Sequence, residues 1–235
     1  MKTFVLASLL FVSNAFALNT ITAQSWLIAD DNGVMIQGEN PNEVRSIASI
    51  TKLMTVMAVV DHQQNMDEKI GQYTRGQLIQ LALVKSDNTA ADQLCKHFPG
   101  GRFQCIQYMN EKAKFIGMEN TKFVEPTGLS PMNISTANDL IKLVLVAQYY
   151  DAVIDAAKHP NVALKVKKKT VNINNTNPLT KTYNFLVSKT GTTRAAGGCI
   201  VLLVKTDYGS RVVVLLGSKN GKTRIPEAEK IVLQG

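Results

Sequence analysis

Two apolar runs near the C-terminus most constrain the fold of this 235-residue chain. They are "GCIVLLVKT" (198–206) and "RVVVLLGS" (211–218), and the short stretch "DYGS" joins them. Successive side chains of a β-strand point to opposite faces, so a strand that is apolar at consecutive positions needs cover on both faces. The sequence therefore predicts a sheet buried between two layers.

The remaining pattern predicts an α+β fold, with a helical block inserted between strands of one antiparallel sheet. "SWLIADDNGVMIQGEN" (25–40) is typical of a β-hairpin that turns at residues 31–33. The hairpin and the late apolar runs should pair, so that both chain ends lie in one sheet. Helices are predicted at 49–64, 74–98 with a break at 86–88, 104–118, 135–158 with Ser135 or Thr136 as its cap, and 226–234 with Pro226 near its start.

The first 17 residues are typical of a secretory signal. Lys2 gives a positive start, an apolar segment covers 4–12, and Ala15-Phe16-Ala17 offers a cleavage site. The apolar segment is shorter than the roughly 20 residues that span a bilayer. We therefore expect an exported protein without a stable membrane anchor, periplasmic or secreted, with residues 18–235 as its catalytic domain. A buried strand or an uncleaved anchor is the alternative.

The formal net charge is +8 and the pI is about 9.4, which suits an anionic polymer, a membrane surface or nucleic acid. Only 6% of residues are aromatic and no nucleic-acid-binding module is visible, so no nucleic-acid partner is expected. The densest basic run, "KVKKK" (165–169), predicts the solvated face of an exposed β-ribbon.

The cysteines and histidines indicate no metal site. Cys95 and Cys105 flank a turn-like stretch, and either a disulfide or two free buried thiols fits their spacing. Cys199 opens an apolar run and should be a core residue. The three histidines have no ligand spacing with one another or with the cysteines.

A lysine stands in the almost entirely apolar stretch "ASITKLMTVMAVV" (48–60). On a helix, Ser49 and Lys52 share a face, which sets a hydroxyl beside an amine. Lys52 can deprotonate Ser49 only as the free amine, so its pKa must fall from about 10.4 toward neutrality. Burial, a second cation and the positive end of the helix all lower a lysine pKa.

A second motif, "SDN" (86–88), falls at the predicted break between helices. Ser86 can relay a proton, and the Asn88 amide can hold a substrate amide through its donor and its acceptor. A second copy of the S-x-N spacing, "SKN" (218–220), follows the late strands and is interpreted as a turn.

The third motif, "KTG" (189–191), precedes the late strands and supplies the second cation, Lys189. Thr190 offers a hydroxyl to a substrate carboxylate, and Gly191 lets a substrate backbone lie against the strand. The backbone N–H of Thr192 can join that of Ser49 in an oxyanion hole.

Together, S-x-x-K, S-x-N and K-T-G are the motifs of β-lactamases and penicillin-binding proteins. The chain resembles the low-molecular-mass penicillin-binding proteins, the serine D-Ala-D-Ala peptidases, from about Ser25 to Glu229. The resemblance implies a penicillin-binding protein/β-lactamase-like fold and no cofactor. It also rests on the stretches "ASITKLMT", "LALVKSDNTAADQL", "PGG", "EPTGLS", "STANDL", "NTNPL" and "SKTGTTRAAGGC".

The resemblance implies an acyl-enzyme on Ser49, peptidoglycan stem peptides and cross-links as substrates, and penicillins as covalent inhibitors. Arg224 matches a family arginine that would help to bind an anionic substrate group, although a surface arginine in a first helical turn is the plainer interpretation. The implied catalytic residues are Ser49, Lys52 and Ser86, and the implied substrate-binding residues are Asn88, Lys189, Thr190, Gly191, Thr192 and Arg224.

Within the family, the chain most resembles the soluble periplasmic endopeptidase branch, which cleaves D-alanyl–diaminopimelate cross-links. A carboxypeptidase remains an alternative. A class A-like β-lactamase is a rival because Glu125-Pro126 superficially resembles its water-activating loop, although the sequence that follows fits the peptidase pattern. A non-enzymatic penicillin- or muropeptide-binding sensor is the other rival.

Overall fold

The computed structural model describes residues 21–206 and 209–234. The predicted signal, residues 1–17, lies outside the described residues. In the two described ranges, no helix combines the length and the apolar character that a membrane span requires.

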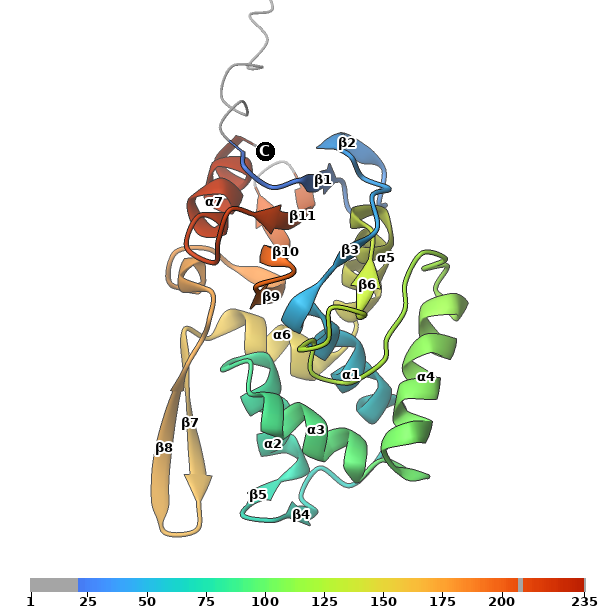
Figure 1. Cartoon of the computed structure of the whole chain (residues 1–235). Coiled ribbons are helices and arrows are strands. Elements are labelled where there is room, and N and C mark those ends of the chain that lie inside the picture. Colours follow the sequence, from blue (N-terminus) through green and yellow to red (C-terminus); the bar gives the residue numbers. More distant parts are fainter. Residues whose placement is uncertain (1–20, 207–208, 235) are drawn as a thin grey trace, which may run out of the picture.

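A five-stranded antiparallel sheet brings the first two and the last three of its strands together from opposite ends of the chain (Figure 1). Trp26 lies opposite Leu215, so the N-terminal hairpin pairs with the C-terminal strands and that prediction is confirmed. The strand order is β2-β1-β11-β10-β9. The strands are β1 Ser25–Ala29, β2 Met35–Glu39, β9 Phe185–Thr193, β10 Gly197–Thr206 and β11 Gly209–Ser218.

Alternate side chains of β10 enter two different hydrophobic cores. Val201 lies in the core that contains helices α1 (Thr51–Asp61) and α5 (Ala137–Ala147). Its neighbour Ile200 lies in the core that helix α7 (Arg224–Gln234) closes. Both side chains are fully buried, which confirms the prediction of a sheet covered on both faces.

The inserted helical block is arranged around α1. Every residue of α1 from Thr51 to Val59 is buried, as its all-round apolar pattern predicted. The break between α2 and α3 is also confirmed, because Asp87 caps α3 by accepting a hydrogen bond from the Ala90 N–H at 2.9 Å. The other elements of this part are η2 Ala48–Ile50, α2 Arg75–Leu83, α3 Asn88–Lys96, α4 Gly101–Phe115 and α6 Asp151–Lys158, with the short strand pairs β3 Arg45–Ser46 and β6 Ile134–Ser135, and β4 Lys69–Ile70 and β5 Tyr73–Thr74.

The single helix predicted at 135–158 is wrong, because the chain forms α5 and α6 with a break at Gln148–Tyr150. Thr136 is the cap of α5, with its side chain accepting from the Asp139 N–H. The Tyr150 backbone is extended, and its hydroxyl donates to Asp61 at 2.6 Å. α5 packs on the sheet strands β1, β10 and β11, whereas α6 packs on β9 and α2, so tertiary packing divides a continuous helical pattern.

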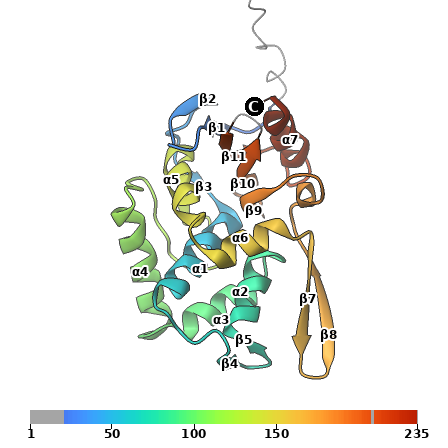
Figure 2. The same ribbon diagram turned by 180° about the vertical axis from the view of Figure 1, so that it is seen from behind.

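The basic run forms the tip of a separate two-stranded ribbon, β7 (Asn161–Val166) and β8 (Lys169–Asn174). Figure 2 shows the ribbon extending from the body of the molecule beside α2. Leu164 and Ile173 are buried toward the helical block, while the lysines are exposed. The prediction of an exposed β-ribbon is therefore confirmed.

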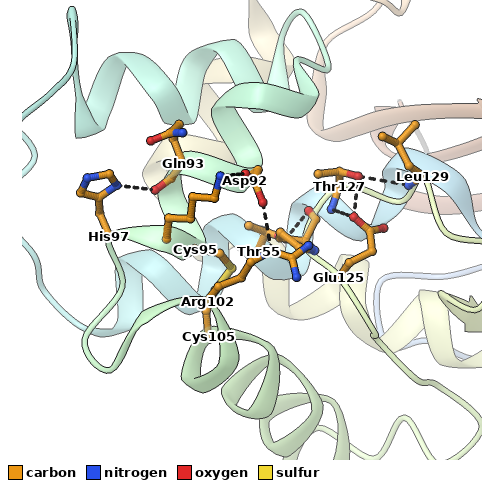
Figure 3. Close-up of polar contacts among 12 residues, drawn as sticks. Thr55, Asp92, Gln93, Cys95, His97, Arg102, Cys105, Glu125, Thr127 and Leu129 are labelled. Atoms are coloured by element: carbon orange, nitrogen blue, oxygen red, sulfur yellow. Dashed lines mark hydrogen bonds and ion pairs between the residues drawn. A yellow bond between two sulfur atoms is a disulfide. The ribbon is translucent and has the colours of Figure 1, made fainter.

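The alternative left open for the cysteines is decided by a disulfide between Cys95 and Cys105, whose Cα atoms lie 5.4 Å apart. It joins the end of α3 to α4, next to an ion pair between Asp92 and Arg102 (Figure 3). Cys199 is a free thiol in the core, as predicted.

We expect the double variant Cys95→Ala/Cys105→Ala to lose about 3 kcal/mol of unfolding free energy, because the bridge restricts a short loop in the unfolded chain. Urea denaturation of the oxidised protein and the variant measures the difference. The wild-type protein with a reductant is the control and should match the variant. Equal stability of the oxidised and reduced proteins would contradict this role.

Candidate active site

Ser49 lies in the short 3₁₀ helix η2, immediately before α1, and its side chain is partly exposed. The residue before it, Ala48, has a φ of 47°, which an alanine rarely adopts. Two glycines press on this backbone: a Cβ on Gly128 would lie 1.9 Å from the Ala48 carbonyl oxygen, and a Cβ on Gly191 would lie 2.9 Å from the Ser49 nitrogen. The surroundings thus hold Ser49 in one backbone conformation.

Lys52 is fully buried one turn further on. Its Nζ lies 2.9 Å from Ser49 Oγ, 2.8 Å from Asn88 Oδ1 and 2.5 Å from the Thr127 carbonyl oxygen. Two of these partners are pure acceptors, and only the serine hydroxyl can donate. A neutral amine would therefore donate to Asn88 and Thr127 and point its lone pair at the Ser49 hydroxyl.

Burial lowers the pKa of Lys52 from 10.5 to about 8, while the carboxylates of Glu125 and Asp87 act in the opposite direction. The sequence argument assigned part of this lowering to a second cation. In the structure, desolvation is the main cause of the lowered pKa, and the charges that act on this pKa, those of Glu125 and Asp87, are negative.

The second hydroxyl–amine pair is formed by Ser86 and Lys189. Lys189 Nζ donates to Ser86 Oγ at 2.8 Å and to the Thr190 carbonyl oxygen at 2.9 Å. Ser86 has a φ of 59° at the break between α2 and α3, so a strained turn aims its hydroxyl. Burial lowers the pKa of Lys189 well below 10.5, and the charges of Lys52 and Arg224 lower it further.

Asn88 is the first residue of α3 and connects the two motifs in space. Its Oδ1 is bonded to Lys52, so the NH₂ group is the part of the amide that remains for a substrate. These side chains thus lie in one cluster, although they come from η2, α1, the break between α2 and α3, the start of α3, and β9. They are Ser49, Lys52, Ser86, Asn88 and Lys189.

The remaining candidates lie at the edge of this cluster. The Thr190 hydroxyl is buried and donates to Thr176 Oγ1 at 2.7 Å. Arg224 is buried, not a surface residue, and its Nη1 donates to the Gly191 carbonyl oxygen at 2.7 Å and to Thr192 Oγ1. Arg224 therefore braces the back of the strand that carries the K-T-G motif, while Thr192 is exposed.

Residues of the loop 125–133 take part in the site, and the sequence motifs did not identify them. Besides the Thr127 carbonyl, Glu125 organises the loop (Figure 3). Its carboxylate accepts from the N–H groups of Thr127 at 2.8 Å and Gly128 at 2.6 Å, and from Asn133 Nδ2 at 2.8 Å. The stretch "EPTGLS" drew attention to this loop without revealing these roles.

Asn133 joins the same loop to the helix that carries Lys52. Its fully buried side chain donates to Thr51 Oγ1 at 3.1 Å and accepts from the Val124 N–H at 2.8 Å. The backbone carbonyl oxygen of Asn133 accepts a hydrogen bond from the Ile47 N–H at 3.1 Å. This asparagine therefore sets the position of the Thr127 carbonyl relative to Ser49 and Lys52. In residues 21–206 and 209–234, no group of three or more His, Cys, Asp or Glu side chains is placed to hold a metal.

The comparisons with known proteins agree with this geometry. The profile of the family described as D-alanyl-D-alanine carboxypeptidase matches residues 12–70 and 62–220. The D-alanyl-D-alanine endopeptidases of Pseudomonas aeruginosa and Escherichia coli are 35% and 36% identical to the chain, in each case over 90% of the chain and 76% of the relative. Penicillin-binding protein D2 of Listeria monocytogenes, solved in its ampicillin-bound form, has a TM-score of 0.81 and 26% identity, over 91% of this chain and 96% of that one.

We predict that Asp87→Asn moves the acid limb of the pH profile for Ser49 acylation to lower pH. The native limb should lie near pH 8, the pKa of Lys52. Removing a negative charge that raises this pKa leaves more free amine at each pH, and a shift of about half a unit is expected. Asparagine caps a helix as well as aspartate does, so α3 should remain intact.

The measurement is the acylation rate with a small activated ester as a function of pH. Asp92→Asn, a change of the same charge further along α3, is the control and should leave the limb in place. A shift to higher pH in Asp87→Asn, or a native limb near 10.5, would contradict the assignment of Lys52 as the titrating group.

Proposed function

The chain belongs to the D-alanyl-D-alanine carboxypeptidase family, and from this premise we propose that it is a serine DD-peptidase that cleaves D-alanyl peptide bonds in peptidoglycan. The observation that carries the proposal is the 2.9 Å contact between Ser49 Oγ and the buried Lys52 amine. The relatives that are 35% and 36% identical are endopeptidases, which favours cross-link cleavage over removal of a terminal D-alanine.

In the proposed reaction, the neutral Lys52 amine takes the proton of Ser49 as Oγ attacks the D-alanyl carbonyl. The ammonium that forms has three N–H groups for its three oxygen neighbours, Ser49 Oγ, Asn88 Oδ1 and the Thr127 carbonyl. Both protonation states of the amine are thus satisfied by hydrogen bonds, so the proton transfer leaves no buried group unpaired.

The developing oxyanion accepts from the backbone N–H groups of Ser49 and Thr192. Ser86 and Lys189 pass a proton to the leaving amine, and Asn88 positions the substrate through its NH₂ group. Thr190 and Arg224 contribute to the strand edge along which the peptide lies. Water then hydrolyses the acyl-enzyme. A β-lactam would follow the first half of the same route and remain on Ser49.

The rival β-lactamase function requires a glutamate that activates water, and Glu125 is poorly suited to that task. Both of its carboxylate oxygens already accept hydrogen bonds from the loop, including the Thr127 hydroxyl at 2.5 Å. A carboxylate whose two oxygens both hold the loop is poorly placed to bind and orient a water molecule. The intact Ser49–Lys52 pair likewise argues against a non-enzymatic sensor.

We also propose that residues 1–17 direct export, that residues 18–235 form one catalytic domain, and that the mature protein acts in the periplasm or outside the cell without a stable membrane anchor. The substrate class supports this placement, because peptidoglycan lies outside the inner membrane. Mass spectrometry of the mature N-terminus tests the cleavage site.

The central prediction is that the purified protein digests isolated sacculi. Cross-linked muropeptide dimers should fall to monomers, as mass spectrometry of the products would reveal, and Ser49→Ala should be inactive. A change from pentapeptides to tetrapeptides instead would indicate a carboxypeptidase. Rapid penicillin turnover that Glu125→Ala abolishes would indicate a β-lactamase, and failure to label with a fluorescent penicillin would support the sensor.

We further predict that Gly191→Ala lowers the rate of acylation by penicillin about 100-fold, the usual cost of losing an oxyanion-hole donor. The added methyl group would stand 2.9 Å from the Ser49 nitrogen and obstruct its N–H. Gly76→Ala is the control, because its Cβ would have no neighbour closer than 3.5 Å. Thermal denaturation of both variants distinguishes a loss of folding from a blocked site. Normal acylation of a folded Gly191→Ala protein would refute the assignment of the Ser49 N–H to the oxyanion hole.

A further inference from the structure

The excess positive charge of this protein is confined to one part of the chain. Nine of the 26 Lys and Arg residues lie within residues 156–206, and none of the 18 Asp and Glu residues does. The rest of the chain is close to neutral. The basic character of the protein is therefore a property of the segment that forms the ribbon and strands β9 and β10, and not of the whole surface.

The tip of the ribbon concentrates this charge. Lys165, Lys167, Lys168 and Lys169 are all exposed, and none has an ion pair among the described residues. Lys167 has a φ of 52° in the turn, a conformation that glycine or asparagine adopts at lower cost. A lysine at this position lowers the stability of the turn relative to glycine, which suggests that its side chain has a role in binding.

Two adjacent hollows lie between these lysines and the residues on either side of Ser86, and we call them together the ribbon groove. Its outer part, about 540 Å³, is lined by Gln72, Tyr73, Val171 and the tip lysines 167–169. Its inner part, about 500 Å³, shares Gln72, Tyr73 and Val171 with the outer part and reaches Lys85 and Asp87, which flank Ser86.

The walls of the ribbon groove are held in place. Gln77 Nε2 of α2 donates to the Lys165 carbonyl oxygen at 2.6 Å, which ties the ribbon to the helical block. Both views show the ribbon alongside α2 (Figures 1 and 2). Strand β8 has six residues and is thus about 20 Å long, enough for a peptide of similar length.

We propose that the ribbon groove binds the anionic stem peptide of the peptidoglycan substrate, in the part remote from the bond that is cleaved. This inference rests on the proposed function. Stem peptides retain free carboxylates. A path that begins next to Ser86 and ends at three unpaired lysines offers cations to a peptide whose D-alanyl bond lies at Ser49. Tyr73 and Val171 give the peptide an apolar wall on the way.

A membrane surface fits these observations less well. Stable binding to a bilayer gains much of its strength from apolar side chains that insert beside the lysines. On this ribbon, Leu164, Val166 and Ile173 are buried against the protein, and the apolar Val171 is 37% exposed and faces the groove. The lysines thus border a hollow whose neighbour reaches the residues next to Ser86, as expected for a peptide site.

The test compares Lys167→Gln/Lys168→Gln/Lys169→Gln with the control Lys114→Gln/Lys181→Gln/Lys205→Gln, which removes the same charge from exposed positions elsewhere. The measurement is kcat/KM at low ionic strength for a soluble cross-linked muropeptide dimer, with its carboxylates either free or amidated. The kcat/KM of the ribbon variant should fall about tenfold with the free-acid dimer and change little with the amidated dimer. The control should change less than twofold with either substrate.

Acylation by a small penicillin, which does not reach the ribbon, reports the integrity of Ser49 separately. If the wild-type protein is not acylated, the proposed function fails, whereas the inference about the ribbon fails if acylation is normal and both triple variants behave alike. Equal losses with free and amidated substrate would also overturn it. The inference would also fail if the ribbon lysines were needed for sedimentation with phosphatidylglycerol vesicles while the ribbon variant cleaved the dimer at the wild-type rate.

A single substitution isolates the strained turn. Lys167→Gly relieves the left-handed lysine, so its thermal midpoint should equal or exceed that of the wild-type protein while kcat/KM for the free-acid dimer falls about twofold or more. A stable Lys167→Gly protein with full activity on the dimer would remove the argument that this lysine serves binding.

Discussion

The buried amine of Lys52 is the interaction on which the rest of the site depends. An ammonium or amine without water needs a protein partner for each of its hydrogen-bonding positions. Here the partners are Ser49 Oγ, Asn88 Oδ1 and the Thr127 carbonyl oxygen, which come from three separate segments of the chain. Hydrogen bonds to one atom, Lys52 Nζ, therefore restrain the positions of all three segments relative to one another.

The supporting structure can be understood from that requirement. The loop with Glu125 and Asn133 presents a backbone carbonyl, and the capped start of α3 presents an amide. The disulfide between Cys95 and Cys105 then fixes the far end of α3 to α4. Each device restrains a segment that would otherwise be a mobile loop or a helix end. Ser86, left-handed at the same break, is placed against Lys189 by the same restraints.

The sequence was most informative where residue types recur at a regular spacing along the chain. Doubly apolar strands predicted the sheet and its two cores, and the i, i+3 spacing predicted the contact between Ser49 and Lys52. A backbone carbonyl has no sequence signature, so the part played by Thr127 was invisible. The break between α5 and α6 depends on which elements each helix packs against, which local periodicity does not encode. The negative charges that oppose the lowering of the Lys52 pKa likewise became apparent only in three dimensions.

The order of the strands has a consequence for the time at which the serine becomes reactive. Gly191 of β9 lies against the Ser49 backbone, and β9 reaches the N-terminal strand β1 only through β10 and β11. Pairings between distant parts of a chain form late and slowly in folding. Ser49 is thus synthesised long before β10 and β11, the strands that connect β9 to β1, so the surroundings of this serine are complete only in a chain that contains the whole sheet.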